Sequence, residues 1–306
     1  MTKNNSIQEY FNILGEIPNF LHKYLKLKIL TRLKNIGYFC GMDYASKELY
    51  NFEYKISRFD HSLSTALITW KLTNDKKQTL AALFHDVSTP CFSHVIDYMN
   101  QDYENQESTE EKTESILRGS KSLEKLLKED NLVLEDIINF KNFSVVDNSR
   151  PKLCADRIDG IILTSIGWTK KLNIKDVPSI INSLELQKNE ENELEIGLKD
   201  EKIAIQLYDL NKEIDILCHS NEDNYMMELL ADITKYALEK KYITYDNLYE
   251  YNEKKLFNIL NSTEDNCLKL LLNIFKTITI NEISEKNLPH VKKRNINPLL
   301  NGKRYL

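Results

Sequence analysis

Residues 58–97 read RFDHSLSTALITWKLTNDKKQTLAALFHDVSTPCFSHVID. Three of the six histidines of the chain lie in this stretch, and one of them, His85, is followed directly by Asp86. The pair ends the apolar run LAALF at residues 80–84, which we interpret as part of a buried helix. Imidazole and carboxylate together suit a divalent ion such as zinc, manganese, iron or nickel. The pattern therefore predicts a helix that ends at a pair of metal ligands.

One short segment cannot fill a coordination sphere, so further ligands must come from elsewhere in the chain. His61 lies in the same stretch, and Asp156 lies in the segment LCADRID at residues 153–159. A single histidine is more often a hydrogen-bonded core residue than a ligand. A further carboxylate ligand is nevertheless needed beside His85 and Asp86, and Asp156 is the best candidate.

His61, His85, Asp86 and Asp156, in this order, resemble the H…HD…D ligand set of the HD-domain metal-dependent phosphohydrolases. The resemblance implies that these four side chains hold one divalent metal ion (Mn, Fe, Ni, Zn or Mg). The flanking residues are similar to the deoxynucleoside triphosphate triphosphohydrolases (dGTPase-like proteins) of that superfamily. RFDHSL resembles their R-x-x-H-S-L, CFSHVID their P-F-S-H-x-x-D, and DRID their D-R-x-D. The resemblance covers about residues 17–165 and implies an HD-domain helical bundle with phosphohydrolase activity.

The resemblance also implies roles for residues near the metal ligands. His94 would be the general acid, Asp97 would orient it, and Arg58 would bind substrate phosphate. Glu110 stands in the place of the acidic residue of the family's H-E motif and is a further catalytic candidate. The alternatives remain open: His94 and Asp97 could form a structural pair, Arg58 a surface salt bridge, and Glu110 part of a solvated loop.

The chain departs from the family pattern at several positions. Thr89 stands where a second catalytic histidine is expected, and Thr109 replaces the histidine of H-E. Tyr38 replaces a glutamine that helps to recognise the sugar. We therefore expect a single metal ion and an altered substrate-binding site that includes Tyr38 and Thr89.

Composition limits the classes of protein that need to be considered. The 306 residues are 42% hydrophobic and 28% charged, with a net charge of −5, which does not indicate nucleic-acid binding. The polar N-terminus, MTKNNSIQEYFN, and the lack of long apolar runs argue against a signal peptide or a membrane span. Five cysteines without a C-x-x-C pair favour a reducing compartment. We expect a cytoplasmic protein with no membrane or nucleic-acid partner, and leave a homo-oligomer open.

Eight glycines and six prolines leave few breaks, and apolar residues mostly recur every three or four positions, so the chain should be mainly α-helical. We expect a small β-hairpin within residues 186–206, in which Leu194–Leu198 pairs with Ile203–Ile205. The expected domains are an HD core at 1–170 and a C-terminal extension at 171–306 packed on it. The basic residues 292–294 could reach an anionic substrate or a neighbouring subunit, and a solvated tail is the favoured prediction. The predicted helical segments are 18–40, 62–73, 77–86, 93–98, 114–127, 134–141, 152–166 and 221–280.

The sequence thus predicts a metal-dependent phosphohydrolase that acts on nucleotides, with a (deoxy)nucleoside triphosphate as the favoured substrate. Catalysis would use a metal-activated water, with His94 as the general acid. One alternative is a phosphatase for nucleoside monophosphates or other small phosphate esters. A second is an inactive nucleotide-binding sensor or scaffold, because two family histidines are absent.

Overall fold

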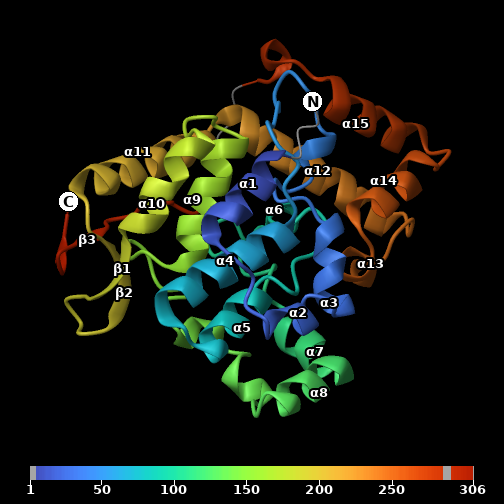
Figure 1. Cartoon of the computed structure of the whole chain (residues 1–306). Coiled ribbons are helices and arrows are strands. Elements are labelled where there is room, and N and C mark those ends of the chain that lie inside the picture. The colour runs from blue at the N-terminus through green and yellow to red at the C-terminus, as the bar shows by residue number, and fades with distance from the viewer. Residues whose placement is uncertain (1–4, 285–290, 306) are drawn as a thin grey trace.

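The computed structural model describes residues 5–284 and 291–305. The first four residues of the polar N-terminal stretch lie outside the described residues. Within the described ranges the chain is mainly helical with one small sheet, as Figure 1 shows, and the predicted fold class is confirmed. No helix in these ranges is long and apolar enough to cross a membrane.

The helices that carry the motif pack together in the centre of the fold (Figure 1). Helix α4 (Arg58–Thr73) lies against both α5 (Lys76–Phe84) and α9 (Ala155–Gly167). Asp75 begins α5, because its carboxylate accepts hydrogen bonds from the backbone N–H groups of the first turn. Most side chains of α4 are buried, since it has neighbours on several sides.

The turn between α5 and α6 (Val95–Met99) has an unusual backbone conformation. Phe92 and Ser93 both have positive φ angles, 67° and 47°, directly before His94. A Cβ atom at Gly41, where φ is 78°, would lie 2.8 Å from the Phe92 ring, so only glycine allows this close approach. The position of His94 therefore depends on packing between two segments that are far apart in the sequence.

The predicted hairpin exists, but its strands differ from the prediction. Strand β1 (Leu184–Lys188) pairs antiparallel with β2 (Leu194–Leu198). Strand β3 (Leu299–Leu300) adds to β2 in parallel, and β4 (Lys303–Arg304) pairs with β3. The sheet is therefore four-stranded, and its second half comes from the C-terminal segment.

The prediction that Ile203–Ile205 forms a strand is wrong. These residues lie in helix α11 (Glu201–Cys218), which begins where Asp200 accepts a hydrogen bond from the backbone N–H of Lys202. The residues that α11 buries recur at helical spacing, namely Ala204, Leu207, Leu210 and Ile214. The segment that suggested a turn between strands is thus a helix cap.

Several other predicted elements differ in detail. Residues 114–127 form two helices, because Ser120 caps the second one. Residues 134–141 form short 3-10 turns, η3 (Leu134–Asp136) and η4 (Phe140–Asn142), in place of a helix. The N-terminal elements are α1 (Asn5–Leu14), α2 (Leu21–Tyr24), α3 (Lys28–Thr31), η1 (Arg32–Asn35) and η2 (Met42–Tyr44). The other elements are α7 (Thr113–Arg118), α8 (Lys121–Glu129), η5 (Ile174–Asp176), α10 (Val177–Ser183), α12 (Asn221–Glu239), α13 (Tyr245–Glu250), α14 (Glu253–Asn261), α15 (Asn266–Thr277) and η6 (Ile280–Glu282).

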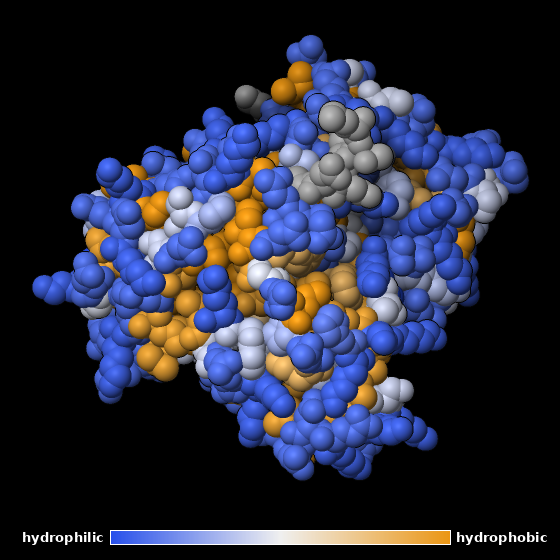
Figure 2. All heavy atoms as spheres, in the orientation of Figure 1, coloured by the Kyte–Doolittle hydropathy of each residue, from blue (hydrophilic) through white to orange (hydrophobic). Residues whose placement is uncertain are grey.

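Helix α1, which the sequence reading did not predict, covers one side of the core. Its residues Tyr10 and Leu14 are buried. Figure 2 shows hydrophobic residues in a broken patch over the region of α1, α4 and α10, with hydrophilic residues around it.

Helices α9 and α11, on either side of residue 170, pack against each other. The division of the chain at this residue stays a prediction.

Candidate metal centre

His61 is held in one orientation by a buried carboxylate. It lies in the first turn of α4, which a reciprocal pair of hydrogen bonds between Ser57 and Asp60 begins. Its Nδ1 lies 2.7 Å from Asp159 Oδ2, and Tyr10 donates a hydrogen bond of 2.6 Å to the other oxygen of the same carboxylate. Asp159 therefore keeps a proton on Nδ1 and directs Nε2 toward the cluster.

His85 is fixed in the same way at the end of α5. Its Nδ1 lies 2.7 Å from the carbonyl oxygen of Ala82, so this nitrogen carries a proton. Its Nε2 lies 3.3 Å from His61 Nε2 and 3.4 Å from Asp156 Oδ1. The Nε2 atoms of His61 and His85 therefore point toward the same position.

Asp156 and Asp86 complete the group of four predicted ligands. Asp156, in the first turn of α9, has its Oδ1 2.9 Å from His61 Nε2. The Asp86 carboxylate oxygens lie 3.8 Å from His61 Nε2 and 3.9 Å from His85 Nε2. Neighbouring ligands on an ion about 2.1 Å away are about 3 Å apart in octahedral geometry. His61, His85 and Asp86 bring ligand atoms within 4.8 Å of one another, which suits a divalent cation. Asp156 Oδ1 lies close to both imidazoles, and its role as the fourth ligand stays a prediction.

The protonation of this group also suits a cation. Burial lowers the pKa of His61, but hydrogen bonds to Asp156 and Asp159 raise it to about 10. Burial raises the pKa of Asp86, but the charges of His85 and Arg58 lower it to about 2. The carboxylates are therefore ionised, and the proton on His61 Nε2 lies where a cation would bind.

A second possible ligand group shares Asp156 with the first. Asp147, Cys154 and Asp156 each bring one ligand atom within 4.8 Å of the others. Burial raises the pKa of the Cys154 thiol to about 12. Asp156 Oδ1 lies 2.9 Å from His61 Nε2 and 3.4 Å from His85 Nε2, so Asp156 also contacts the histidine cluster.

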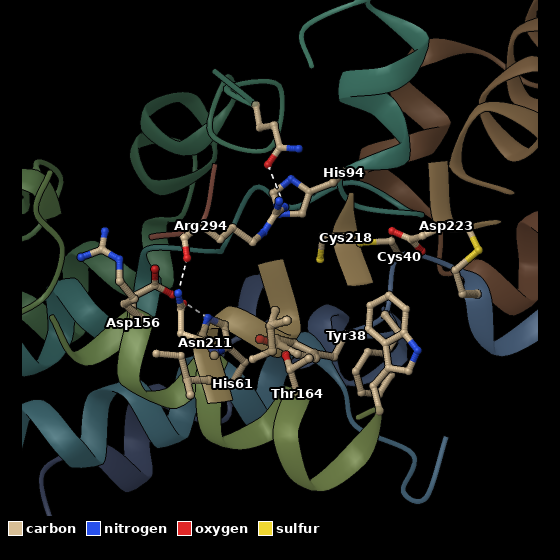
Figure 3. Close-up of a pocket in the computed structure, with 18 of the residues that line it drawn as sticks. Tyr38, Cys40, His61, His94, Asp156, Thr164, Asn211, Cys218, Asp223 and Arg294 are labelled. Carbon is tan, nitrogen blue, oxygen red and sulfur yellow. Dashed lines mark hydrogen bonds and ion pairs between the residues drawn. The ribbon is translucent and has the colours of Figure 1, made fainter. Parts of the chain in front are cut away.

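His94 and Asp97 form the predicted pair beside this cluster. His94 Nδ1 lies 2.8 Å from Asp97 Oδ2, and the other oxygen of Asp97 accepts a hydrogen bond from the backbone N–H of Ser108. His94 lines the cavity shown in Figure 3, whereas Asp97 is fully buried. Asp97 is therefore placed to orient the ring and leave Nε2 free for a ligand.

Arg58 and Tyr38 lie next to the cluster. Arg58 donates a hydrogen bond of 3.1 Å to Asp86, and its guanidinium lies 5.1 Å from the centre of the Tyr38 ring. The Tyr38 ring centre is 5.3 Å from that of His61. A Cβ at Gly160 would lie 3.3 Å from the Tyr38 hydroxyl, so glycine leaves room for the tyrosine. Arg58 and Tyr38, two of the three predicted substrate-binding residues, line the cavity shown in Figure 3.

Two connected cavities meet at the cluster, because His61, Asp156, Arg58 and His94 line both of them. The smaller cavity, of about 230 Å³, is shown in Figure 3 and is here named the inner cavity. The larger cavity, which we call the vestibule, has a volume of about 520 Å³ and a polar lining. Much of the inner lining is aromatic, aliphatic or sulfur-containing, including Phe39, Met42, Ile161, Trp168, Ile214, Cys218 and Met227.

Two other predicted site residues, Glu110 and Thr89, make no side-chain hydrogen bond or ion pair with the metal-binding cluster within the described residues. Glu110 lines the vestibule, but its carboxylate lies 2.6 Å from Lys141 Nζ. Thr89 is completely buried, lines neither cavity, and accepts a hydrogen bond from Arg32 through its carbonyl oxygen. The proposed catalytic and binding roles of these two residues stay predictions.

The sequence analysis missed part of the cavity lining. Arg294 lines both cavities and Lys292 lines the vestibule, so these two positions favour the alternative of contact with an anionic substrate over a solvated tail. Lys293, between them, is exposed as predicted. Arg150 also lines both cavities. Lys292 and Arg294 lie in a segment without helix or strand, so no helical or strand spacing in the sequence marks them as cavity residues.

Residues 58–162 match the family model described as HD domain, which confirms the predicted HD-domain resemblance for this segment. The predicted closeness to the dGTPase-like proteins stays a prediction. The chain is 24% identical over 282 residues to the uncharacterized protein YdhJ of Bacillus subtilis, covering 91% of this chain and 82% of that protein. It is also 24% identical over 130 residues to the metal-dependent phosphohydrolase cns2 of Cordyceps militaris, covering 42% of this chain and 37% of that protein.

Proposed function

We propose that the protein is a metal-dependent phosphohydrolase that acts on nucleotides, with a (deoxy)nucleoside triphosphate as the favoured substrate. The observation that carries the proposal is the cluster of two imidazoles and two carboxylates where the two cavities meet. The HD-domain match at residues 58–162 and the printed name of the Cordyceps relative support the hydrolase class.

Each group of the site has a proposed task. A divalent ion held by His61, His85, Asp86 and Asp156 would polarise a phosphoryl oxygen and lower the pKa of a nearby water. The protonated His94 ring would donate a proton to the leaving oxygen, while Asp97 holds the ring in place. Arg58 would bind a phosphate oxygen from beside Asp86.

The two cavities suggest how a nucleotide would be oriented. The inner cavity offers Tyr38, Phe39 and Trp168, whose rings suit a base or sugar. The vestibule is lined by several lysines and arginines, which suit phosphate. This arrangement would place the ester bond of a nucleotide beside the metal-binding cluster and His94.

Turnover assays with defined metals test the proposal. Metal-stripped protein is reloaded with Mn, Fe, Ni, Zn or Mg and incubated with nucleoside mono-, di- and triphosphates. We expect tripolyphosphate as the product from triphosphates, whereas a monophosphatase would release orthophosphate. Asp86→Ala should reduce turnover at least about 100-fold. Asp246→Ala, which removes an exposed carboxylate paired with Lys112, is the matched control.

Two results would contradict the proposal in different ways. If no phosphate ester or anhydride is cleaved and Asp86→Ala leaves metal binding unchanged, the metal centre is not functional. Tight nucleotide binding without turnover would instead favour the sensor alternative. The complete four-residue ligand set argues against a sensor, because binding alone does not require an activated water.

A further inference from the structure

The C-terminal segment 291–297 forms one wall of the vestibule. Val291 and Ile296 are buried and anchor it at both ends. Between these anchors, Lys292 and Arg294 line the vestibule and Lys293 is exposed. Backbone hydrogen bonds fix this register, and they run from Lys292 N to Tyr103 O (3.0 Å), from Arg294 N to Asp215 Oδ1 (2.6 Å) and from Asn297 N to Pro151 O (2.8 Å).

Arg150 joins these two residues from the loop that precedes α9. It donates a hydrogen bond of 3.1 Å to the carbonyl oxygen of Asn295, so it contacts the same segment. Arg294 donates to the carbonyl of Lys292 and to the Gln106 side chain, at 3.0 and 3.3 Å. These partners are neutral oxygens, which position the cations without neutralising them.

The cationic cluster formed by Arg150, Lys292 and Arg294 has no carboxylate partner. No ion pair within residues 5–284 and 291–305 includes any of the three side chains. Of the nearby carboxylates, Asp86 pairs with Arg58 and Glu110 pairs with Lys141. Glu107 also lines the vestibule. Burial lowers the pKa of Arg294, but nearby ionisable groups, including Asp223, raise it overall. The Asp147 carboxylate lies 3.9 Å from Arg157.

The three cations also repel one another. Burial lowers the pKa of Arg150 to about 10, and the neighbouring charges of Arg157 and Arg294 contribute to this shift. Burial likewise lowers the pKa of Lys292, with further contributions from Arg294 and Arg150. Like charges confined in a partly buried cavity make the folded state less stable, and a bound anion removes that repulsion.

We infer that Arg150, Lys292 and Arg294 bind the outer phosphates of a nucleoside polyphosphate or of a short polyphosphate chain. Arg150 and Arg294 line the inner cavity as well as the vestibule, so an anion held by them lies close to the metal-binding cluster. Two guanidinium groups and an ammonium can share the oxygens of more than one phosphate. The position of the anion along a substrate rests on the proposed function, but anion binding itself does not.

Calorimetric titration of the full metal-loaded chain with tripolyphosphate and with orthophosphate tests this inference. Lys292→Gln and Arg150→Gln should each weaken tripolyphosphate binding about 10-fold. Lys293→Gln, which removes a neighbouring exposed cation, should change it less than about 2-fold. Lys292→Arg should retain most of the affinity, because it keeps the charge.

The expected pattern includes a preference for tripolyphosphate over orthophosphate, because three cations face the cavity. Equal effects of Lys292→Gln and Lys293→Gln would overturn the inference, and so would equal affinity for the two anions. Circular dichroism and thermal unfolding identify a variant that has lost its fold. In that case the tripolyphosphate affinity of Lys292→Arg is compared with that of the unmodified protein, and a loss of about 10-fold or more would overturn the inference.

Kinetics separate this inference from the proposed function. If triphosphates are hydrolysed but Arg150→Gln and Lys292→Gln retain the KM of Lys293→Gln, the cationic cluster is not a substrate site and the hydrolase proposal stands. If nothing is hydrolysed but tripolyphosphate binds through the cluster, the anion site stands and the hydrolase proposal fails.

Discussion

His61 interacts with a carboxylate through each of its ring nitrogens, and the two carboxylates lie on opposite sides of the ring. Asp156 lies on the side of the metal-binding cluster, whereas Asp159 lies behind the ring and is completely buried. Asp159 is the second aspartate of the D-R-x-D motif, and the group that it supports is the His61 imidazole, about a hundred residues away in the chain.

Asp159→Asn should weaken metal binding about 10- to 100-fold, because the amide removes the negative charge behind the His61 ring and offers one acceptor oxygen where Tyr10 and His61 now use two. Metal affinity measured by competition with a chelator checks this. Tyr10→Phe is the matched control, since it removes the other hydrogen bond to Asp159 and leaves the contact with His61. Equal metal affinities of Asp159→Asn and the unmodified protein would show that His61 does not need this support.

Glu253 couples the loop before His94 to pH. It is buried, and its carboxylate accepts a hydrogen bond of 3.3 Å from the backbone N–H of Phe92. Burial, together with the charge of Asp43, raises the pKa of Glu253 to about 7. Because the folded-state pKa exceeds the unfolded one, the stability that Glu253 contributes is complete below about pH 4.5 and is lost as pH rises to about 7.

Glu253→Gln should therefore remove part of the loss of stability between about pH 4.5 and 7. At pH 8 we expect this variant to be more stable by about 2 kcal/mol, since no buried charge forms. Urea unfolding at several pH values measures the effect. Glu250→Gln, at an exposed glutamate nearby, should leave the pH profile unchanged. Parallel profiles for Glu253→Gln and the unmodified protein would contradict the expected ionisation.

At the scale of elements, apolar spacing explains which helix predictions succeeded, and a helix cap explains one that failed. The segments that became α4, α5 and α9 have apolar residues at continuous helical spacing, and the sequence predicted each of them within a few residues. The predicted strand at Ile203–Ile205 failed because Asp200 acts as an N-cap. A polar four-residue segment fits both a hairpin turn and a helix start, and the choice depends on packing of α11 against α9.

Ser57 provides a test of one cap that serves the site. Its hydroxyl accepts a hydrogen bond from the backbone N–H of Asp60, and Asp60 accepts one from the backbone N–H of Ser57. Ser57→Ala should lower the free energy of unfolding by about 1 kcal/mol, as urea denaturation would measure. Ser57→Thr retains the acceptor and should stay within about 0.5 kcal/mol of the unmodified protein. Equal stability of Ser57→Ala and Ser57→Thr would show that the cap is unimportant.

At the scale of the whole molecule, the C-terminal segment joins the sheet to the HD region. Arg304 on β4 donates to both carboxylate oxygens of Glu195 on β2, at 2.6 and 2.7 Å. Glu195 is completely buried, and one of its oxygens also accepts a hydrogen bond from the backbone N–H of Leu153, shortly before α9. The pair therefore connects the end of the chain to the segment that leads into Asp156.

Arg304→Ala should destabilise the protein by about 3–5 kcal/mol, because it leaves a buried carboxylate without its cation. Thermal and urea unfolding measure the loss. The double variant Arg304→Ala with Glu195→Gln should recover part of the stability, since it removes the unpaired charge as well. If the double variant is no more stable than Arg304→Ala alone, the loss comes from packing and not from charge.

The sequence predicted the metal-binding residues better than the rest of the cavity, and distance along the chain is the reason. The ligand motifs have a recognisable order, and helical spacing places three of the four residues near helix ends. Lys292 and Arg294 reach the cavity through an irregular segment fixed by hydrogen bonds to three separate parts of the chain. Such contacts have no local pattern, so only the folded structure relates these residues to the site.

The placement of this segment has a consequence for synthesis of the protein. A ribosome releases His61, His85, Asp86 and Asp156 well before it reaches Lys292 and Arg294. A growing chain could therefore load its metal while the phosphate-facing wall is still missing. Under the proposed function, cation capture and recognition of a polyphosphate would then mature at different times. Loss of the segment from residue 291 onward would remove Lys292 and Arg294, and also Arg304, the partner of buried Glu195.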